Sequence, residues 1–179
     1  ATFTPTVKGK GRKVVYFPSC VVRSMGPARD DPDQRALYEA TLSVLNKAGY
    51  DVVYPEGMSE LCCGLTFESK GFFEQADKKA AELERELRRV SGNGEIPVLF
   101  DTSPCLYAMR CKIEPDLRIY EPVEFIHDHL MDKLRFTKLD KSVAIHVTCS
   151  SVKMGLAGKF KALAEACAEK VVAPRNIHC

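Results

Sequence analysis

The chain has 179 residues, of which 45% are hydrophobic and 28% charged, with a formal net charge of +2 at pH 7. These values are ordinary for a globular protein with one sizeable core, and they exclude a disordered chain. No window approaches the roughly 18 consecutive apolar residues that span a bilayer, and the small, interleaved charge gives no indication of a nucleic-acid partner. The N-terminus lacks the apolar run of a signal peptide, so we expect a cytoplasmic protein.

Apolar segments rich in Val, Ile and Tyr alternate along the chain with segments of helical period. Helices are predicted over residues 32–48, where Gly49 follows as a stop, over the apolar positions from Ala76 to Val90, and over 122–134 and about 152–169. The strands are predicted at 13–17, 51–54, 97–100, 117–120, 143–147 and 170–173. This alternation is typical of βα units and predicts an α/β fold with a mostly parallel sheet.

A weak internal repeat divides the chain. The stretch VVYFPSCVVRSMG at 14–26 aligns without a gap with VAIHVTCSSVKMG at 143–155, which pairs Cys20 with Cys149. It predicts two pseudo-repeated βα lobes, the first over residues 1–138 and the second, truncated, over 139–179. Because the chain begins with Ala1 and ends at Cys179 within a second motif, we expect it to be part of a longer protein.

Eight cysteines carry the strongest functional signal. Without a secretory signal, metal ligands or redox thiols are more consistent with them than a disulfide framework. Cys111 and Cys167 fall in helical stretches and are predicted to be small buried hydrophobes. The other six follow the carboxyl ends of predicted strands, the edge where open α/β sheets bind ligands. They are Cys20, Cys62, Cys63, Cys105, Cys149 and Cys179.

The adjacent pair Cys62 and Cys63 needs a turn. In a strand the two side chains would point to opposite faces, and in a helix they would diverge by roughly 100°. Gly64 supplies the backbone freedom for a turn that directs both thiols to one centre. With Cys20 and Cys105 they give four thiols, which suit either tetrahedral zinc or an iron–sulfur cluster. The alternative is a set of reduced cysteines packed at the sheet edge.

Several polar residues near these cysteines have two interpretations each. Residues 101–103 (Asp-Thr-Ser) precede a predicted helix and could cap it or hold an anion. Arg23, Arg29 and Lys70 could receive a substrate carboxylate or lie in solvent. His146 and His178 precede Cys149 and Cys179, and each could be a ligand, a proton carrier or a histidine hydrogen-bonded at a strand end.

The order of the cysteine motifs resembles the cysteine-rich CCG domain. That domain occurs in the B subunit of heterodisulfide reductase, in the iron–sulfur subunits of glycolate oxidase and anaerobic glycerol-3-phosphate dehydrogenase, and in FAD-linked D-lactate dehydrogenases. The resemblance covers nearly the whole chain and is carried by YFPSCVVRSMGPARDD, LCCGLTFESKGFFEQAD, VLFDTSPC and AIHVTCSSVKMGL. It is greatest to the large single-chain flavin and iron–sulfur dehydrogenases that act on D-2-hydroxy acids.

The resemblance implies a set of ligands. In this family both cysteines of the CCG element can ligate an unusual iron–sulfur centre, and one of them bridges two irons. Thr102 stands where the family has the first of two further thiols, so a four-cysteine site is easier to build here than a five-cysteine one. The implied metal ligands are Cys20, Cys62, Cys63 and Cys105, and the implied cofactor-binding residues of the incomplete second lobe are Cys149 and Cys179.

The function implied by the resemblance is electron transfer in an enzyme of several domains. The chain would be the iron–sulfur part of an FAD-linked dehydrogenase that oxidises D-lactate or D-2-hydroxyglutarate, and alone it would be inactive. Its partners would be an FAD-binding domain and a ferredoxin-like domain of the same chain, an electron acceptor, the hydroxy acid and, for the whole enzyme, a membrane surface. One alternative is a structural or docking module with zinc or no metal. Another is a thiol switch at Cys62 and Cys63, which requires a thiol of lowered pKa.

Overall fold

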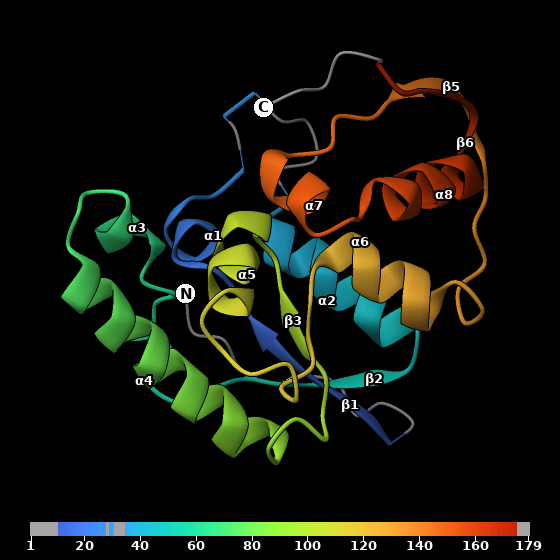
Figure 1. Ribbon diagram of the computed structural model, residues 1–179. Coiled ribbons are helices and arrows are strands. Elements are labelled where there is room, and N and C mark those ends of the chain that lie inside the picture. Colours follow the sequence, from blue (N-terminus) through green and yellow to red (C-terminus); the bar gives the residue numbers. More distant parts are fainter. Residues whose placement is uncertain (1–10, 28, 31–34, 175–179) are drawn as a thin grey trace. The chain divides into compact units, whose positions relative to one another are not determined.

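The structure is a computed structural model that describes residues 11–27, 29–30 and 35–174 (Figure 1). The chain forms two compact units, Ala1–Tyr120 and Glu121–Cys179. Two residues singled out in the sequence, His178 and Cys179, lie outside the described residues. The lobe boundary after residue 138 rests on the sequence repeat and stays a prediction.

The first unit is built on a parallel sheet of four strands in the order β2-β1-β3-β4. The central strand β1 (Arg12–Phe17) pairs with β2 (Tyr50–Val53) on one side and β3 (Val98–Phe100) on the other, and β4 (Ile119–Tyr120) lies outside β3. The side chains from Val14 to Phe17 and from Val98 to Phe100 are at most 2% exposed, although successive residues of a strand point to opposite faces, so both faces of the sheet are covered at β1 and β3. The predicted α/β fold with a mostly parallel sheet is confirmed.

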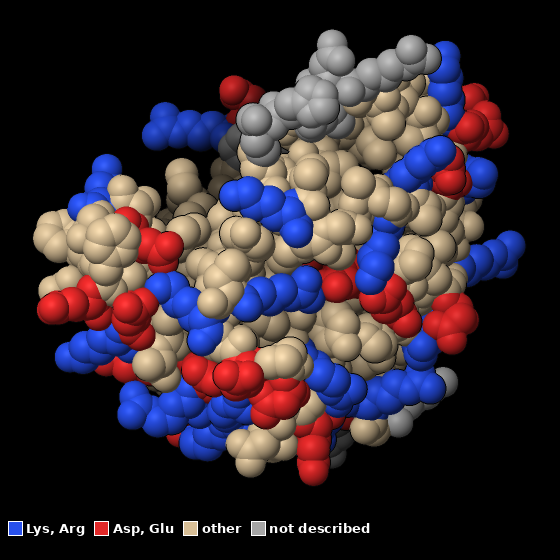
Figure 2. Space-filling model, in the orientation of Figure 1, with Lys and Arg blue, Asp and Glu red and all other residues tan. Residues whose placement is uncertain are grey.

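Helices connect these strands. They are α1 (Cys20–Ser24), α2 (Leu37–Lys47), α3 (Leu65–Glu68), α4 (Phe73–Ser91) and α5 (Ser103–Arg110). Along α4 the predicted apolar positions Ala76, Ala80, Leu83 and Leu87 are buried, and ion pairs such as Lys79–Glu82 cover its other face. Figure 2 shows Lys and Arg interleaved with Asp and Glu over the face in view. Gly49 follows α2 with a φ of +79°, as the predicted stop requires.

The second unit combines short helices with a two-stranded parallel sheet, β5-β6. Its elements are α6 (Pro122–Phe125), the π-helix η1 (Ile126–Leu130), β5 (Leu139–Ala144), α7 (Cys149–Lys153), α8 (Ala157–Cys167) and β6 (Ala168–Val172). In the described part of the chain, no helix in either unit combines the length and apolar character needed to cross a membrane.

Three predictions in this unit were wrong in their bounds. The helix predicted over 152–169 is two helices, because the chain turns at Gly155, whose φ is +74°. The strand predicted at 143–147 runs from Leu139 to Ala144, since it pairs with one neighbour only and most of its side chains are exposed, so apolarity does not mark its ends. The helical segment from Pro122 ends at Leu130 instead of residue 134.

The same strand-to-helix connection occurs in both units. After β1, Ser19 is the N-cap of α1 and its side chain accepts a hydrogen bond from the Val22 N–H. After β5, Thr148 is the N-cap of α7 and its side chain accepts from the Ser151 N–H. The backbone angles agree, with φ −63° and ψ 160° at Ser19 and φ −65° and ψ 157° at Thr148. In each case a cysteine is the first residue of the helix, which supports the predicted pseudo-repeat.

Candidate cysteine site

Three of the predicted thiols come together in the first unit. The Cys62 thiol is hydrogen-bonded to Cys63, and the Cys63 thiol in turn to Cys105. Cys62 and Cys63 lie in the loop between β2 and α3, and Cys105 lies in the first turn of α5, beyond the end of β3. Cys63 and Cys105 are 4% and 8% exposed, whereas Cys62 is half-buried. The carboxyl edge of the sheet therefore gathers thiols from two separate connections, as the sequence predicted.

A left-handed turn directs both members of the adjacent pair. Gly64 has a φ of +83°, and its N–H donates a hydrogen bond to Cys62 Sγ at 3.4 Å. The Leu65 N–H donates to Cys63. A Cβ at Gly64 would lie 2.3 Å from the backbone oxygen of Ala76 in α4. Only glycine fits this position, because the close approach leaves no room for a Cβ and the conformation disfavours one.

The Cys62 and Cys63 thiols are held in the protonated form. The hydrogen bond to Cys63, and then burial, raise the pKa of Cys62 well above its ordinary value. The hydrogen bond to Cys105, followed by a smaller contribution from burial, raises the pKa of Cys63 to about 11, against the lowering effect of Cys62. A thiol switch needs a thiolate near neutral pH, so these shifts disfavour that interpretation.

Cys20, the fourth predicted ligand, is the half-buried first residue of α1. Helix α1 is fastened to the loop before the cysteine pair by Arg23, whose guanidinium donates to the backbone oxygens of Met58 and of Leu61, the latter at 2.9 Å. The same guanidinium lies 5.8 Å from the centre of the Phe17 ring. Arg23 therefore joins two cysteine-bearing segments, a role that neither sequence interpretation had considered.

A polar cluster at the ends of β1 and β3 was also missed by the sequence interpretation. The Asp101 carboxylate accepts hydrogen bonds from the Tyr16 hydroxyl at 2.8 Å and the Ser19 N–H at 2.9 Å. The Thr102 hydroxyl lies 2.8 Å from Ser19 Oγ and 3.1 Å from Asp101 Oδ1. Thr102 is the N-cap of α5, but its side chain makes no capping hydrogen bond. The Thr102 hydroxyl is engaged in this cluster.

Comparison with known families identifies the domain. The model of the cysteine-rich CCG domain matches residues 14–110, more than half of the chain. The chain belongs to this family. The matched segment begins in β1, ends in α5 and contains Cys20, the Cys62–Cys63–Gly64 turn and Cys105.

Two curated relatives carry similar sequence. The C subunit of anaerobic glycerol-3-phosphate dehydrogenase from Escherichia coli (strain K12) is 27% identical over 154 residues, which are 80% of this chain and 36% of that protein. Lactate utilization protein A of Bacillus velezensis is 27% identical over 152 residues, which are 79% of this chain and 59% of that protein. The CCG chain thus spans only part of the length of each relative. No solved structure matches it.

The chemistry of the donor set can be compared with the iron–sulfur centre that the family resemblance implies. Cysteine thiolates are the ligands of such clusters, and three of the four predicted thiols are linked through hydrogen bonds. Over residues 11–27, 29–30 and 35–174, however, no three or more Cys, His, Asp or Glu side chains are already arranged to hold a metal ion. The side chains are of the type that binds an iron–sulfur cluster, but a four-cysteine site requires Cys20 to approach the three other thiols.

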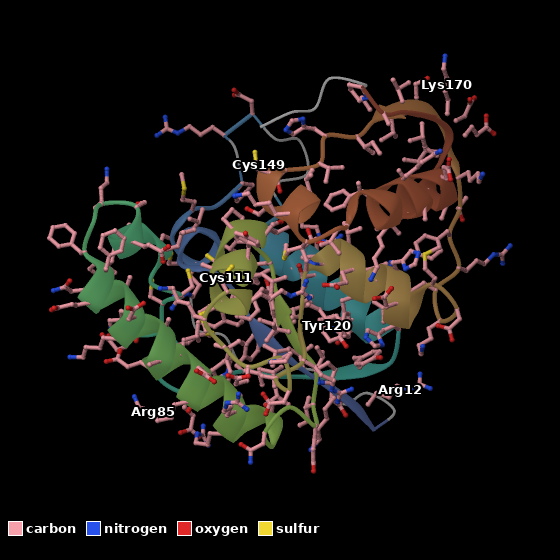
Figure 3. The ribbon with its side chains drawn as sticks, in the orientation of Figure 1. Arg12, Arg85, Cys111, Tyr120, Cys149 and Lys170 are labelled. Carbon is pink, nitrogen blue, oxygen red and sulfur yellow. The ribbon has the colours of Figure 1, made fainter. Side chains whose placement is uncertain are left out.

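The remaining cysteines lie elsewhere. Cys149 is exposed at the start of α7 in the second unit, where Figure 3 labels it, and it is disulfide-bonded, unlike the free thiol that was predicted. Cys111 is the exposed C-cap residue that follows α5, so the prediction that it lies buried within a helix was wrong. Cys167, at the end of α8, is only half-buried, and burial raises its pKa. His146 is exposed and follows β5, so it is not the strand residue that was predicted.

Proposed function

We propose that this CCG domain is the iron–sulfur electron-transfer part of an FAD-linked oxidoreductase that oxidises a D-2-hydroxy acid, D-lactate or D-2-hydroxyglutarate. The observation that carries the proposal is the cluster of Cys62, Cys63 and Cys105 at the carboxyl edge of a parallel sheet. In this proposal these three residues and Cys20 are the metal ligands. Cys149 and Cys179 bind a cofactor in the second lobe, which requires that the disulfide of Cys149 be reduced.

The proposed roles of the side chains follow from their surroundings. An iron–sulfur cluster, when bound, supplies one-electron transfer. The CCG turn presents two sulfurs side by side, and the buried Cys105 presents a third from α5. Gly64 and Leu65 donate N–H hydrogen bonds to the first two sulfurs, which stabilise negative charge there. Because ligation needs thiolates, metal binding would release the protons that these thiols hold.

The substrate and the partners are proposed from similarity. The names of the two relatives refer to glycerol-3-phosphate dehydrogenase and to lactate utilization, and both proteins are longer than the matched segment. An FAD-binding domain would take the hydride, a ferredoxin-like domain would pass electrons to or from the cysteine site, and an external acceptor would receive them. We also propose a cytoplasmic location, with the whole enzyme at a membrane surface and the 179-residue chain inactive by itself.

The test uses the whole protein, purified without oxygen. D-lactate, D-2-hydroxyglutarate and glycerol 3-phosphate are added separately, and flavin bleaching and the EPR spectrum are followed. The proposal expects one of the two hydroxy acids to bleach the flavin and to reduce an iron–sulfur signal that Cys63→Ser removes and Cys111→Ser keeps. Flavin reduction by glycerol 3-phosphate alone would refute the proposed substrate. A reducible iron–sulfur signal that Cys63→Ser leaves unchanged would refute the proposed site.

A second candidate function is a structural or docking module in which zinc or no metal occupies the cysteines. One observation favours it: the described residues hold no group of side chains already arranged for a metal. The family resemblance agrees with it, because it implies a thiol at the position of Thr102. Such a module predicts zinc or no metal at these cysteines and full electron transfer in Cys63→Ser. The same experiment therefore separates the two functions.

A further inference from the structure

The Asp101 carboxylate lies where two cysteine-bearing connections of the first unit begin. Asp101 directly follows β3 and precedes α5. Its two oxygens accept from Tyr16 in β1 and from Ser19 in the β1–α1 connection. Ser19, whose N–H it binds, is adjacent to Cys20. Cys105 lies one helical turn beyond Asp101 along its own segment. One side chain thus holds together two segments that are 82 residues apart in sequence.

The donors to this carboxylate are held in place. Tyr16 is fully buried in the central strand, so its hydroxyl is fixed by the packing of the ring. Ser19 is 2% exposed and is the N-cap of α1. Within the described part of the chain the hydrogen-bond donors to Asp101 are neutral groups, from Tyr16, Ser19 and Thr102. These contacts place the Asp101 carboxylate close to the cysteine edge.

We propose that Asp101 is a positioning residue of the cysteine site, which fixes the start of α1 against the start of α5 and so sets the places of Cys20 and Cys105. This inference deepens the proposed function and rests on it, since it states which contact sets the place of Cys20, the fourth proposed ligand. It also assigns a charge effect, because a negative group near a cluster lowers the reduction potential of that cluster.

The first test needs no metal. Alkylation rates of each cysteine are measured by mass spectrometry in the 179-residue chain, in Asp101→Asn and in Asp116→Asn. Asp116 is the matched control because its carboxylate, bound to Arg88, belongs to the same unit but not to the cysteine edge. Rates are compared in urea concentrations at which the variants have equal free energies of unfolding, so that a general loss of stability does not contribute.

We expect Asp101→Asn to raise the alkylation rates of Cys20 and Cys105 by about tenfold, since a broken buried hydrogen bond makes local opening easier. Asp116→Asn should leave both rates unchanged. Rates in Asp101→Asn that stay within about twofold of the control would overturn the proposal. If Asp101→Asn does not fold, Tyr16→Phe takes its place, because it removes one hydrogen-bond donor and keeps the ring. We expect a selective rise in the alkylation rates of Cys20 and Cys105, and unchanged rates would overturn the proposal.

The second test uses the whole protein. Asp101→Asn should shift the midpoint potential of the cluster upward, whereas Asp116→Asn should not, and an unchanged potential in a loaded Asp101→Asn protein would overturn the charge effect. A whole protein without an iron–sulfur centre would refute the proposed function, but the alkylation rates would still decide whether Asp101 positions the two cysteines. The two failures are therefore distinguishable.

Discussion

Gly64→Ala is the substitution that tests the geometry of the CCG turn most sharply. The residue has a φ of +83°, which costs about 1–2 kcal/mol for any residue with a Cβ. The added Cβ would also lie 2.3, 2.9 and 3.0 Å from the O, C and Cα atoms of Ala76. These are backbone atoms of a buried turn of α4, so they cannot rotate away, and overpacking of this kind costs about 1–3 kcal/mol more.

Gly71→Ala is the matched control. Its φ of +82° is almost the same, but nothing lies within 4 Å of a Cβ built there. We expect urea unfolding to show a loss of about 1–2 kcal/mol for Gly71→Ala and about 2–5 kcal/mol for Gly64→Ala. Losses that agree within about 0.5 kcal/mol would refute the close approach to Ala76 as the reason for glycine. Since the Gly64 N–H binds Cys62 Sγ, Gly64→Ala should also alter the cysteine site.

Three further substitutions test other contacts. Arg23→Lys should lower the free energy of unfolding by about 1–2 kcal/mol, because an ammonium cannot replace a guanidinium that binds two carbonyl oxygens; equal urea midpoints would contradict this. Burial raises the pKa of Tyr54 from 10.0 to about 12, so the folded state keeps a proton that the unfolded chain releases, and stability should fall as the pH rises through that window. Tyr54→Phe should make that fall less steep, and identical slopes would exclude the residue as a cause. Lys159→Met should destabilise the second unit by about 1 kcal/mol at low salt and by less in molar salt, because the ammonium lies 2.5 Å from the Asp128 carboxylate; a loss that salt leaves unchanged would argue against an ionic contribution.

The parts of the fold that burial dictates were predictable from the sequence. Strands β1 and β3 are paired on both sides, so they are continuous apolar runs, and the period of α4 reproduces its buried face. The exposed β5 and the break at Gly155 gave no such signal. Local apolarity reports only on elements that are packed on more than one side.

The unusual residues of the candidate site could be predicted from the sequence, whereas its ordinary polar residues could not. Adjacent cysteines before a glycine are unusual, and they predicted a turn that the structure contains. Asp101 and Arg23 are ordinary polar residues in sequence. The Ser19 N–H that binds Asp101 lies 82 residues away, and the carbonyl groups that bind Arg23 lie 35 and 38 residues away. One signal could have indicated Asp101: a buried tyrosine in the central strand needs a hydrogen-bond acceptor at the same edge.

The most direct measurement of the central claim is the iron, zinc and acid-labile sulfide content of the whole protein, with its EPR spectrum, purified without oxygen. A double variant, Cys20→Ser with Cys63→Ser, is compared with Cys111→Ser, which changes an exposed cysteine outside the cluster. If the cysteine edge holds an iron–sulfur centre, the double variant loses the iron and sulfide of one cluster while Cys111→Ser loses none. Equal iron and sulfide in both variants, or zinc in place of iron, would contradict the account.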